Sequence, residues 1–175
     1  MATGTVILDI GGCVLPDNSA GNEFAELVKV QSSASAPSPA FIHALFDDTS
    51  NEHLMFGFRM PVNYASAPVI KLQYKMASAT SGNVKLECAI AAVSDGDAQD
   101  VDANAFATTN SSAATAVPGT VGHMDEISIT LTNDDGLAAG DFIIVLINRD
   151  PEDTGNDTAT GDLELIAASL EYTTT

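Results

Sequence analysis

The sequence predicts an all-β protein, a jelly-roll-like antiparallel β-sandwich with an N-terminal extension. Apolar and polar residues alternate with a period of two in several short segments, and turn-forming residues separate those segments. No helical period continues beyond about two turns, which favours a sandwich over a mixed fold. The 175 residues, 45% of them apolar, suffice for one buried core. We expect an N-terminal arm and linker over residues 1–40 and a sandwich domain over residues 41–175.

The N-terminal extension contains two short apolar segments, at residues 5–10 and 24–30. Residues 31–40 are rich in Ser, Ala and Pro, which is typical of a flexible linker. Two short strands cannot build a core alone, so they must pack on something larger. We expect the arm to add a strand to, or pack against, a neighbouring subunit or a shell beneath it; the alternative is that both strands fold back onto the same chain. The expected assembly contacts are Val6, Leu8, Ile10, Phe24, Leu27, Val28 and Val30.

Seven further strands are predicted after the linker. They cover residues 41–46, 54–60, 70–76, 84–92, 127–131, 142–147 and 163–172. The strand at 70–76 is the clearest, because Ile70, Leu72 and Tyr74 alternate with polar residues. The long stretch at 98–122 lacks alternation and suits a crossover of the jelly-roll kind, or else an exposed contact loop.

The strand at 142–147 is apolar on both faces. One face can fill the space between the sheets, and the other must be covered by a loop, the N-terminal segment or a neighbouring subunit. We therefore expect a homo-oligomer, with a trimer favoured.

The charge of the chain restricts its partners. With 24 acidic and 6 basic residues the formal net charge is −18, which repels nucleic acid and disfavours anionic membranes. We expect neither as a partner. The acidic surface either keeps the protein in solution or suits a salty medium, where charges are screened.

Little in the sequence indicates catalysis, and we expect neither an enzyme nor a cofactor. His43, His53 and His123 are isolated in sequence, and we expect each to be a polar surface or strand-end residue. Cys13 and Cys88 match no metal-binding spacing, and Cys88 fits a buried strand position. We expect no catalytic residue.

The acidic residues offer one weak candidate for a metal site, on a single loop. Closely spaced carboxylates can supply several Ca²⁺ ligands, but the twelfth position of an EF-hand-like loop is Phe106 rather than Glu. We therefore expect a solvated loop and no required metal. Its carboxylates are Asp95, Asp97, Asp100 and Asp102. Farther along, we expect Arg149 to form a local, partly exposed ion pair beside the acidic loop at Glu152 and Asp153.

Several turns and strand ends are similar to a known family. The segments are NYASAP at 63–68, LQYK at 72–75, ATSGNV at 79–84, AGD at 139–141, RD at 149–150 and LEYT at 170–173. They resemble small β-sandwich virion proteins of tailed bacteriophages, over about residues 31–175. The resemblance implies a sandwich that assembles on the virion, often as trimers, and it transfers no catalytic residues.

The expected function follows from this resemblance. It implies a capsid decoration (cement) protein that binds the major capsid protein on the capsid exterior and stabilises the shell. Residues 1–20 contain no Lys or Arg, so we expect no signal peptide and synthesis in the host cytoplasm. The alternative is a carbohydrate- or receptor-binding module of a phage fibre or other appendage. The lack of Trp and the presence of only three Tyr weigh against that alternative, because sugar sites commonly use aromatic platforms.

Overall fold

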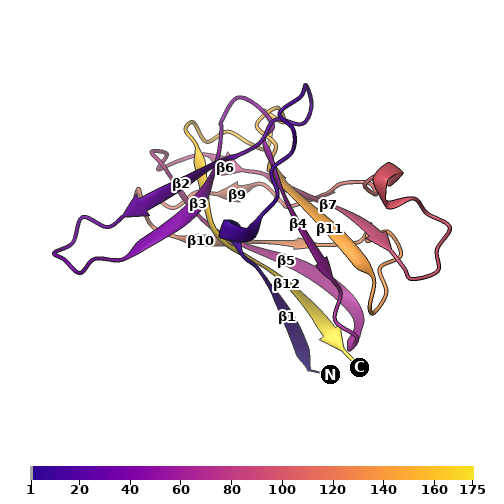
Figure 1. Ribbon diagram of the computed structural model, residues 1–175. Coiled ribbons are helices and arrows are strands. Elements are labelled where there is room, and N and C mark those ends of the chain that lie inside the picture. The colour runs from indigo at the N-terminus through magenta and orange to yellow at the C-terminus, as the bar shows by residue number, and fades with distance from the viewer. Residues whose placement is uncertain (1) are drawn as a thin grey trace.

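Two antiparallel sheets pack face to face in the computed structural model, which describes residues 2–175 (Figure 1). The predicted all-β sandwich is confirmed. The strands are β1 (Thr3–Leu8), β2 (Glu26–Gln31), β3 (Ala40–Phe46), β4 (His53–Arg59), β5 (Tyr64–Met76), β6 (Asn83–Val84), β7 (Leu86–Val93), β8 (Asn110–Ser111), β9 (Thr115–Ala116), β10 (Asp125–Thr130), β11 (Phe142–Arg149) and β12 (Leu163–Thr174). Two 3-10 turns, η1 (Ile10–Gly12) and η2 (Val101–Ala103), complete the elements. No helix among the described residues is long and apolar enough to cross a membrane.

The larger sheet has six strands in the order β10-β5-β12-β3-β2, with β1 also paired to β12. The second sheet has the order β4-β11-β7-β8, and β6 pairs with β9 separately. Alternating side chains of both sheets fill the space between them, as the period-two pattern predicts. Ile143, Val145 and Ile147 of β11 are fully buried there, whereas Ile144 and Leu146 on the outer face are half-buried.

Strand β12 changes its partner midway along one edge. Its other edge pairs with β5 along the strand. On the changing edge, Leu163–Leu165 pair with β3, and β1 takes over from Ala168 onward. The register shifts between Leu165 and Ala167, which leaves Ile166 at the point of exchange.

For β1, the structure favours the alternative that the strand folds back onto its own chain over the expected contact with a neighbouring subunit. Strand β1 lies in the sheet of its own chain, and Leu8 and Ile10 are 3% and 4% exposed in its core. The physical reason is the partner exchange, because β12 would otherwise present several unpaired backbone groups. Val14 and Phe24 also bridge to β4 of the same chain, at Met55 and His53.

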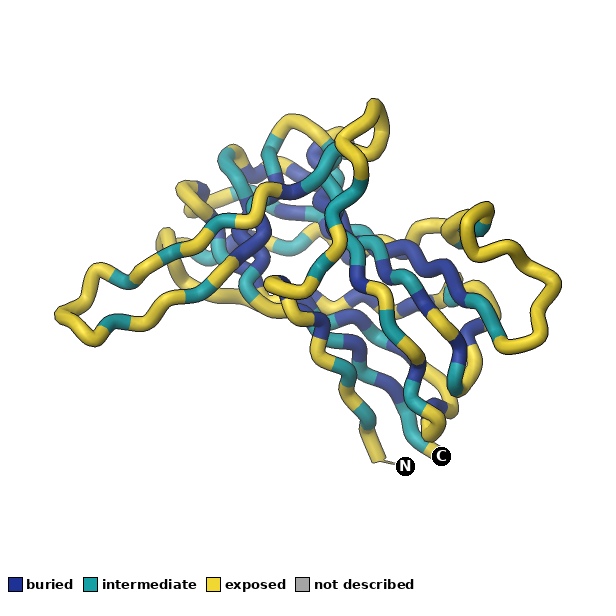
Figure 2. The backbone as a smooth tube through the Cα atoms, in the orientation of Figure 1, coloured by how far each residue is buried: buried dark blue, intermediate teal, exposed yellow. Residues whose placement is uncertain are grey.

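The stretch predicted as a linker is instead the tip of a hairpin formed by β2 and β3. The backbone N–H of Ser32 donates to the carbonyl of Pro39 over 2.8 Å, and the Gln31 side-chain amide donates to the carbonyl of Ser38 over 2.7 Å. Figures 1 and 2 show this hairpin projecting from the body of the sandwich, with a mostly exposed tip. We call residues 26–43 the arm.

A buried ion pair holds the long loop between β11 and β12. Arg149 is 0% exposed, and its guanidinium donates to both carboxylate oxygens of Asp157, over 2.9 and 2.7 Å. It also donates to the carbonyls of Ala159 and Gly161. The predicted partly exposed pair of Arg149 beside Glu152 and Asp153 is therefore wrong, since the partner is Asp157, which is buried.

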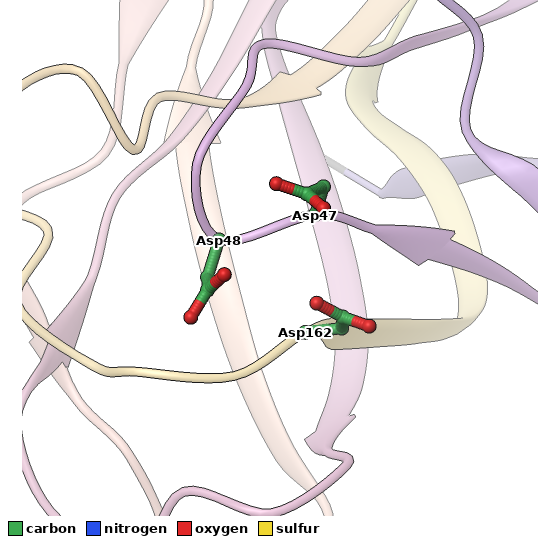
Figure 3. A group of neighbouring side chains, drawn as sticks. All are labelled: Asp47, Asp48 and Asp162. Carbon is green, nitrogen blue, oxygen red and sulfur yellow. The ribbon is translucent and has the colours of Figure 1, made fainter.

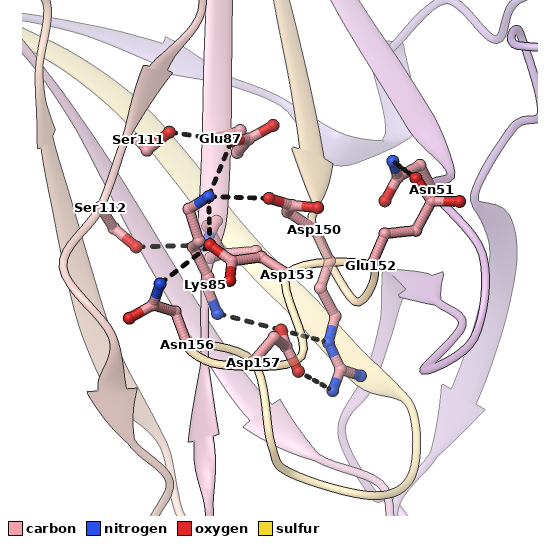
Figure 4. A network of polar contacts seen from close by, with 12 residues as sticks. Asn51, Lys85, Glu87, Ser111, Ser112, Asp150, Glu152, Asp153, Asn156 and Asp157 are labelled. Atoms are coloured by element: carbon pink, nitrogen blue, oxygen red, sulfur yellow. Dashed lines mark hydrogen bonds and ion pairs between the residues drawn. The ribbon is translucent and has the colours of Figure 1, made fainter.

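The nearer acids of this loop bind a different cation (Figure 4). The Lys85 ammonium lies 2.7 Å from Asp150 and 3.0 Å from Asp153. These contacts raise the pKa of Lys85, chiefly through its bond to Asp150. The Lys85 backbone N–H also donates to Asp157, so one carboxylate joins the two clusters.

Replacement of Asp157 tests the role of this network. Asp157→Ala leaves the Arg149 guanidinium buried without its carboxylate, and we expect a loss of about 3–5 kcal/mol in the free energy of unfolding, measured with urea. Asp153→Ala is the matched control, because it removes one partly exposed partner of Lys85 and should cost about 0–1 kcal/mol. Equal losses in the two variants would contradict the account.

Candidate functional site

The acidic loop singled out in the sequence does not gather its carboxylates. Asp97 accepts the backbone N–H of Ser94, and Asp100 accepts that of Asp102 at the start of η2. These are local turn contacts, and the loop is exposed. Within residues 2–175, the carboxylates that could share a metal ion lie elsewhere.

Asp47, Asp48 and Asp162 bring their carboxylates together where β3 ends and β12 begins (Figure 3). Their nearest oxygens all lie within 4.8 Å of one another. Two of these residues follow β3 and the third precedes β12, so the pairing of β3 with β12 assembles the group. No local sequence pattern indicates this group, because 113 positions separate Asp48 from its backbone partner Gly161, which precedes Asp162.

The three carboxylates lie close enough for their negative charges to repel one another. Burial, followed by the charges of Asp47 and Asp48, raises the pKa of Asp162. Hydrogen bonds from Thr49 instead lower the pKa of Asp47. The three residues could hold a divalent cation, but Ca²⁺ takes about six to eight oxygen ligands. Because Asp47 and Asp48 already accept hydrogen bonds from their own chain, we expect folding not to require one.

A second group of residues forms an open depression at one end of the other sheet. Phe142, Arg59 and Val93 are aligned across β11, β4 and β7. Together with Ser94, Asp95 and Gly140 they line a volume of about 470 Å³. Phe142 is 41% exposed, and its ring lies against the side-chain-free face of Gly57.

The polar groups of this depression include unused donors and acceptors. Arg59 donates from Nε to the carbonyl of Gly140 over 2.9 Å, and its two terminal amino groups form no hydrogen bond with residues 2–175. The carboxylate of Asp95 likewise accepts none from the described chain, and both side chains are exposed. An aromatic face, a guanidinium and a carboxylate thus line one hollow. This combination suits a polar ligand that has an apolar face.

The walls of the depression are held by a buried acid. Asp141 is 4% exposed, and its carboxylate accepts the hydroxyl of Ser94 and the backbone N–H of Ala138, both over 2.7 Å. The backbone of Met60 bonds to Asp141 and to Gly140. These contacts fix the two loops that carry the lining residues, so little ordering should accompany binding.

The three histidines do not assemble a catalytic group. His123 is exposed, and His53 lies 3.1 Å from the carbonyl of Glu23. His43 is only 3% exposed, which corrects the expectation of a surface residue, and its Nδ1 lies 3.0 Å from Glu164. Burial lowers the pKa of His43 despite the nearby carboxylate. Lys75 also pairs with Glu164, so this cluster is a structural contact at the base of the arm.

The residues expected to make assembly contacts fall into two groups. Leu8 and Ile10 are buried, while Val6 and Phe24 are partly buried against their own chain, so all four contribute to the body of the sandwich. The others lie on the arm, where Leu27 is 36% exposed. The remaining two, Val28 and Val30, are half-buried there.

Comparisons with known proteins find similarity to solved structures but no match in sequence. No protein family and no curated protein matches the sequence. Among solved structures, the chain is similar to the C-terminal CBM6 of the marine laminarinase LamC from Zobellia galactanivorans (9% identity, TM-score 0.43, 95% of this chain and 98% of that one). It is also similar to CBM35 of Abf62 from Cellvibrio japonicus (9% identity, TM-score 0.43, 98% and 99%). A third is the Cellvibrio mixtus lichenase 5A module solved with cellotriose (10% identity, TM-score 0.40, 93% and 97%). Nothing in these comparisons links the chain to virions.

The crowded carboxylates give a testable stability effect. Because the pKa of Asp162 is raised in the folded state, its ionised form is penalised there, and that penalty is present at neutral pH. Asp162→Asn should raise the melting temperature at pH 7 by about 1–2 °C, the scale of a surface-charge change. The gain should shrink as the pH falls through the raised pKa towards the ordinary value for Asp.

The matched control is Asp102→Asn, which removes one charge from the exposed acidic loop. An equal rise in melting temperature in both variants would show that the effect comes from net charge and not from the three crowded carboxylates. Stability unchanged or lower in Asp162→Asn would contradict the crowding account.

Proposed function

We propose that the protein is a non-catalytic β-sandwich binding module and that its ligand is a saccharide, bound in the depression around Phe142. One observation carries this proposal. An exposed aromatic ring lies beside charged side chains that have unused hydrogen-bonding groups, on loops that the buried carboxylate of Asp141 holds in place. The C–H face of a sugar ring packs on an aromatic ring, and its hydroxyls bond to charged side chains. The volume of about 470 Å³ falls within the usual range of about 300–1,000 Å³ for ligand pockets.

The distribution of aromatic residues supports this choice of site. Tyr64, Tyr74 and Tyr172 are all buried, so none of them offers a platform. Phe142 and Phe106 are the large aromatics with the greatest exposure, at 41% and 36%. Phe142 lies beside Arg59 and Asp95, whereas Phe106 does not line the depression.

A second candidate function is a structural protein of a virion, such as a capsid decoration protein, as the resemblance implies. The specific observation that favours it is the projecting arm, because subunits of a shell often join through such extensions. Electron microscopy of the native assembly separates the two candidates. A regular array of copies over a shell would support decoration, and copies confined to the tips of appendages would support ligand binding.

Substitution in the depression tests the saccharide proposal. Cellotriose, β-1,4-galactotriose and mannan serve as the first probes in isothermal titration, followed by a glycan array. Phe142→Ala should lower the affinity of any saccharide that binds by at least about tenfold, since an aromatic contact contributes on the order of 1 kcal/mol beyond its buried area. Arg59→Met should weaken binding to a similar degree through lost hydrogen bonds.

Phe106→Ala is the matched control, because it removes an equally exposed ring from another part of the chain. The proposal is overturned if no saccharide binds the folded wild-type protein. It is also overturned if Phe106→Ala weakens binding as strongly as Phe142→Ala.

A further inference from the structure

In the arm, β3 extends past the body of the sandwich. The face of β3 that is buried between the two sheets continues along the arm. Ala44 and Phe46 of β3 are fully buried between the sheets. Ile42, the next residue on the same face, is 43% exposed, and its neighbour Leu27 is 36% exposed. Among residues 2–175, no strand of the second sheet covers Ile42 and Leu27, so these two apolar side chains are exposed to solvent. A two-stranded hairpin is only marginally stable alone, which favours a partner for this face.

A groove lies at the base of the arm, where β12 exchanges β3 for β1. Its volume is about 310 Å³, and Phe41 and Ile42 of the arm form one wall. Ile7, which is 73% exposed, and Ile166 add further apolar surface. Asp9 lines the same groove and contributes a carboxylate. The groove is thus apolar with one acidic group.

The uncovered face of the arm is complementary in charge to the groove. The arm contains one Lys and one Glu, but Glu26 lies on the opposite face from Leu27 and Ile42, so Lys29 is the charged residue of the uncovered face. The single cation, Lys29, lies opposite Ile42 on the uncovered face. It is exposed and forms no ion pair with residues 2–175. The groove offers an apolar wall for Ile42 and Leu27 and a carboxylate for Lys29.

We propose that the arm docks into the groove of a second copy of this chain, and that two such contacts related by a two-fold axis form a dimer. Arm and groove adjoin through Ile42, so an axis near this residue places each arm over the other groove. Every contact then occurs twice, as in an isologous interface. Lys29 of one copy faces Asp9 of the other. This inference is independent of the saccharide site, whose lining residues lie around the ends of β4 and β7 and the start of β11 and include none of the arm.

Sedimentation velocity at micromolar concentrations tests this dimer. We expect a dimer for the wild-type protein, and at least a tenfold weaker association for the double variant Leu27→Ser/Ile42→Ser. The control is Val62→Ser, which removes a more exposed apolar side chain, 78% exposed, from a turn outside the arm and the groove. Thermal unfolding of each variant identifies any that fail to fold.

A reciprocal change of charge identifies the occupant of the groove. Lys29→Glu should weaken association by at least tenfold, because it opposes Asp9 with a like charge. Asp9→Lys combined with Lys29→Glu should restore it, an outcome that only a second copy of the chain produces. A wild-type monomer at about 100 μM, a trimer, or a folded double variant that stays as weak as Lys29→Glu would each overturn the proposal.

Discussion

The exchange of partners along β12 is the constraint on which the rest of the structure depends. One edge of this strand binds β5, while the other binds β3 for three residues and then β1. A long strand has more edge than one short neighbour can cover, and unpaired backbone groups beside a core are costly. The chain meets this requirement with its own first strand. The N-terminus is therefore part of the body of the sandwich, and β3 is free to diverge.

The same exchange creates the features on which the interaction proposals rest. Once β3 leaves β12, its first residues pair with β2 alone and become the arm. The space between the diverging β3 and the incoming β1 becomes the apolar groove. The three pairs that β3 retains bring Asp47 and Asp48 next to Asp162. Arg149 stabilises this end of the sheet through the loop that leads into β12. The depression around Phe142 depends instead on the second sheet and on the buried carboxylate of Asp141.

Much of the fold could be predicted because alternation reports which face of a strand is buried. The strands around Leu72 and Ile129 lie where this pattern places them, with their apolar faces inward. Alternation does not report which strand is the neighbour. The pattern at Val6 is the same whether β1 pairs with its own chain or with another copy, so the sequence left both alternatives open, and the structure shows the pairing within the chain. Composition does not separate a linker from a hairpin tip, because Ser, Ala and Pro residues suit both, and here Gln31 closes the tip.

The candidate sites were harder to predict, because they combine residues that are distant in the sequence. Asp95 was singled out for its acidic neighbours, yet in the structure it lies beside Phe142 and Arg59. Arg149 was assigned the nearest acids in sequence, whereas burial selects Asp157, which can accept two hydrogen bonds from the guanidinium. Which residues come together in these sites depends on the order of the strands in the sheets, and a local sequence pattern does not report that order.

Amide hydrogen exchange, measured in dilute protein and again at a concentration that favours association, tests the partner exchange of β12 most directly. The account predicts slow exchange in β1 at both concentrations, because its backbone bonds belong to the body of the sandwich. It predicts fast exchange in β2 and in the first residues of β3 when the protein is dilute, with protection appearing as copies associate. Fast exchange throughout β1 in dilute protein, or an arm already protected there as strongly as β5, would contradict it.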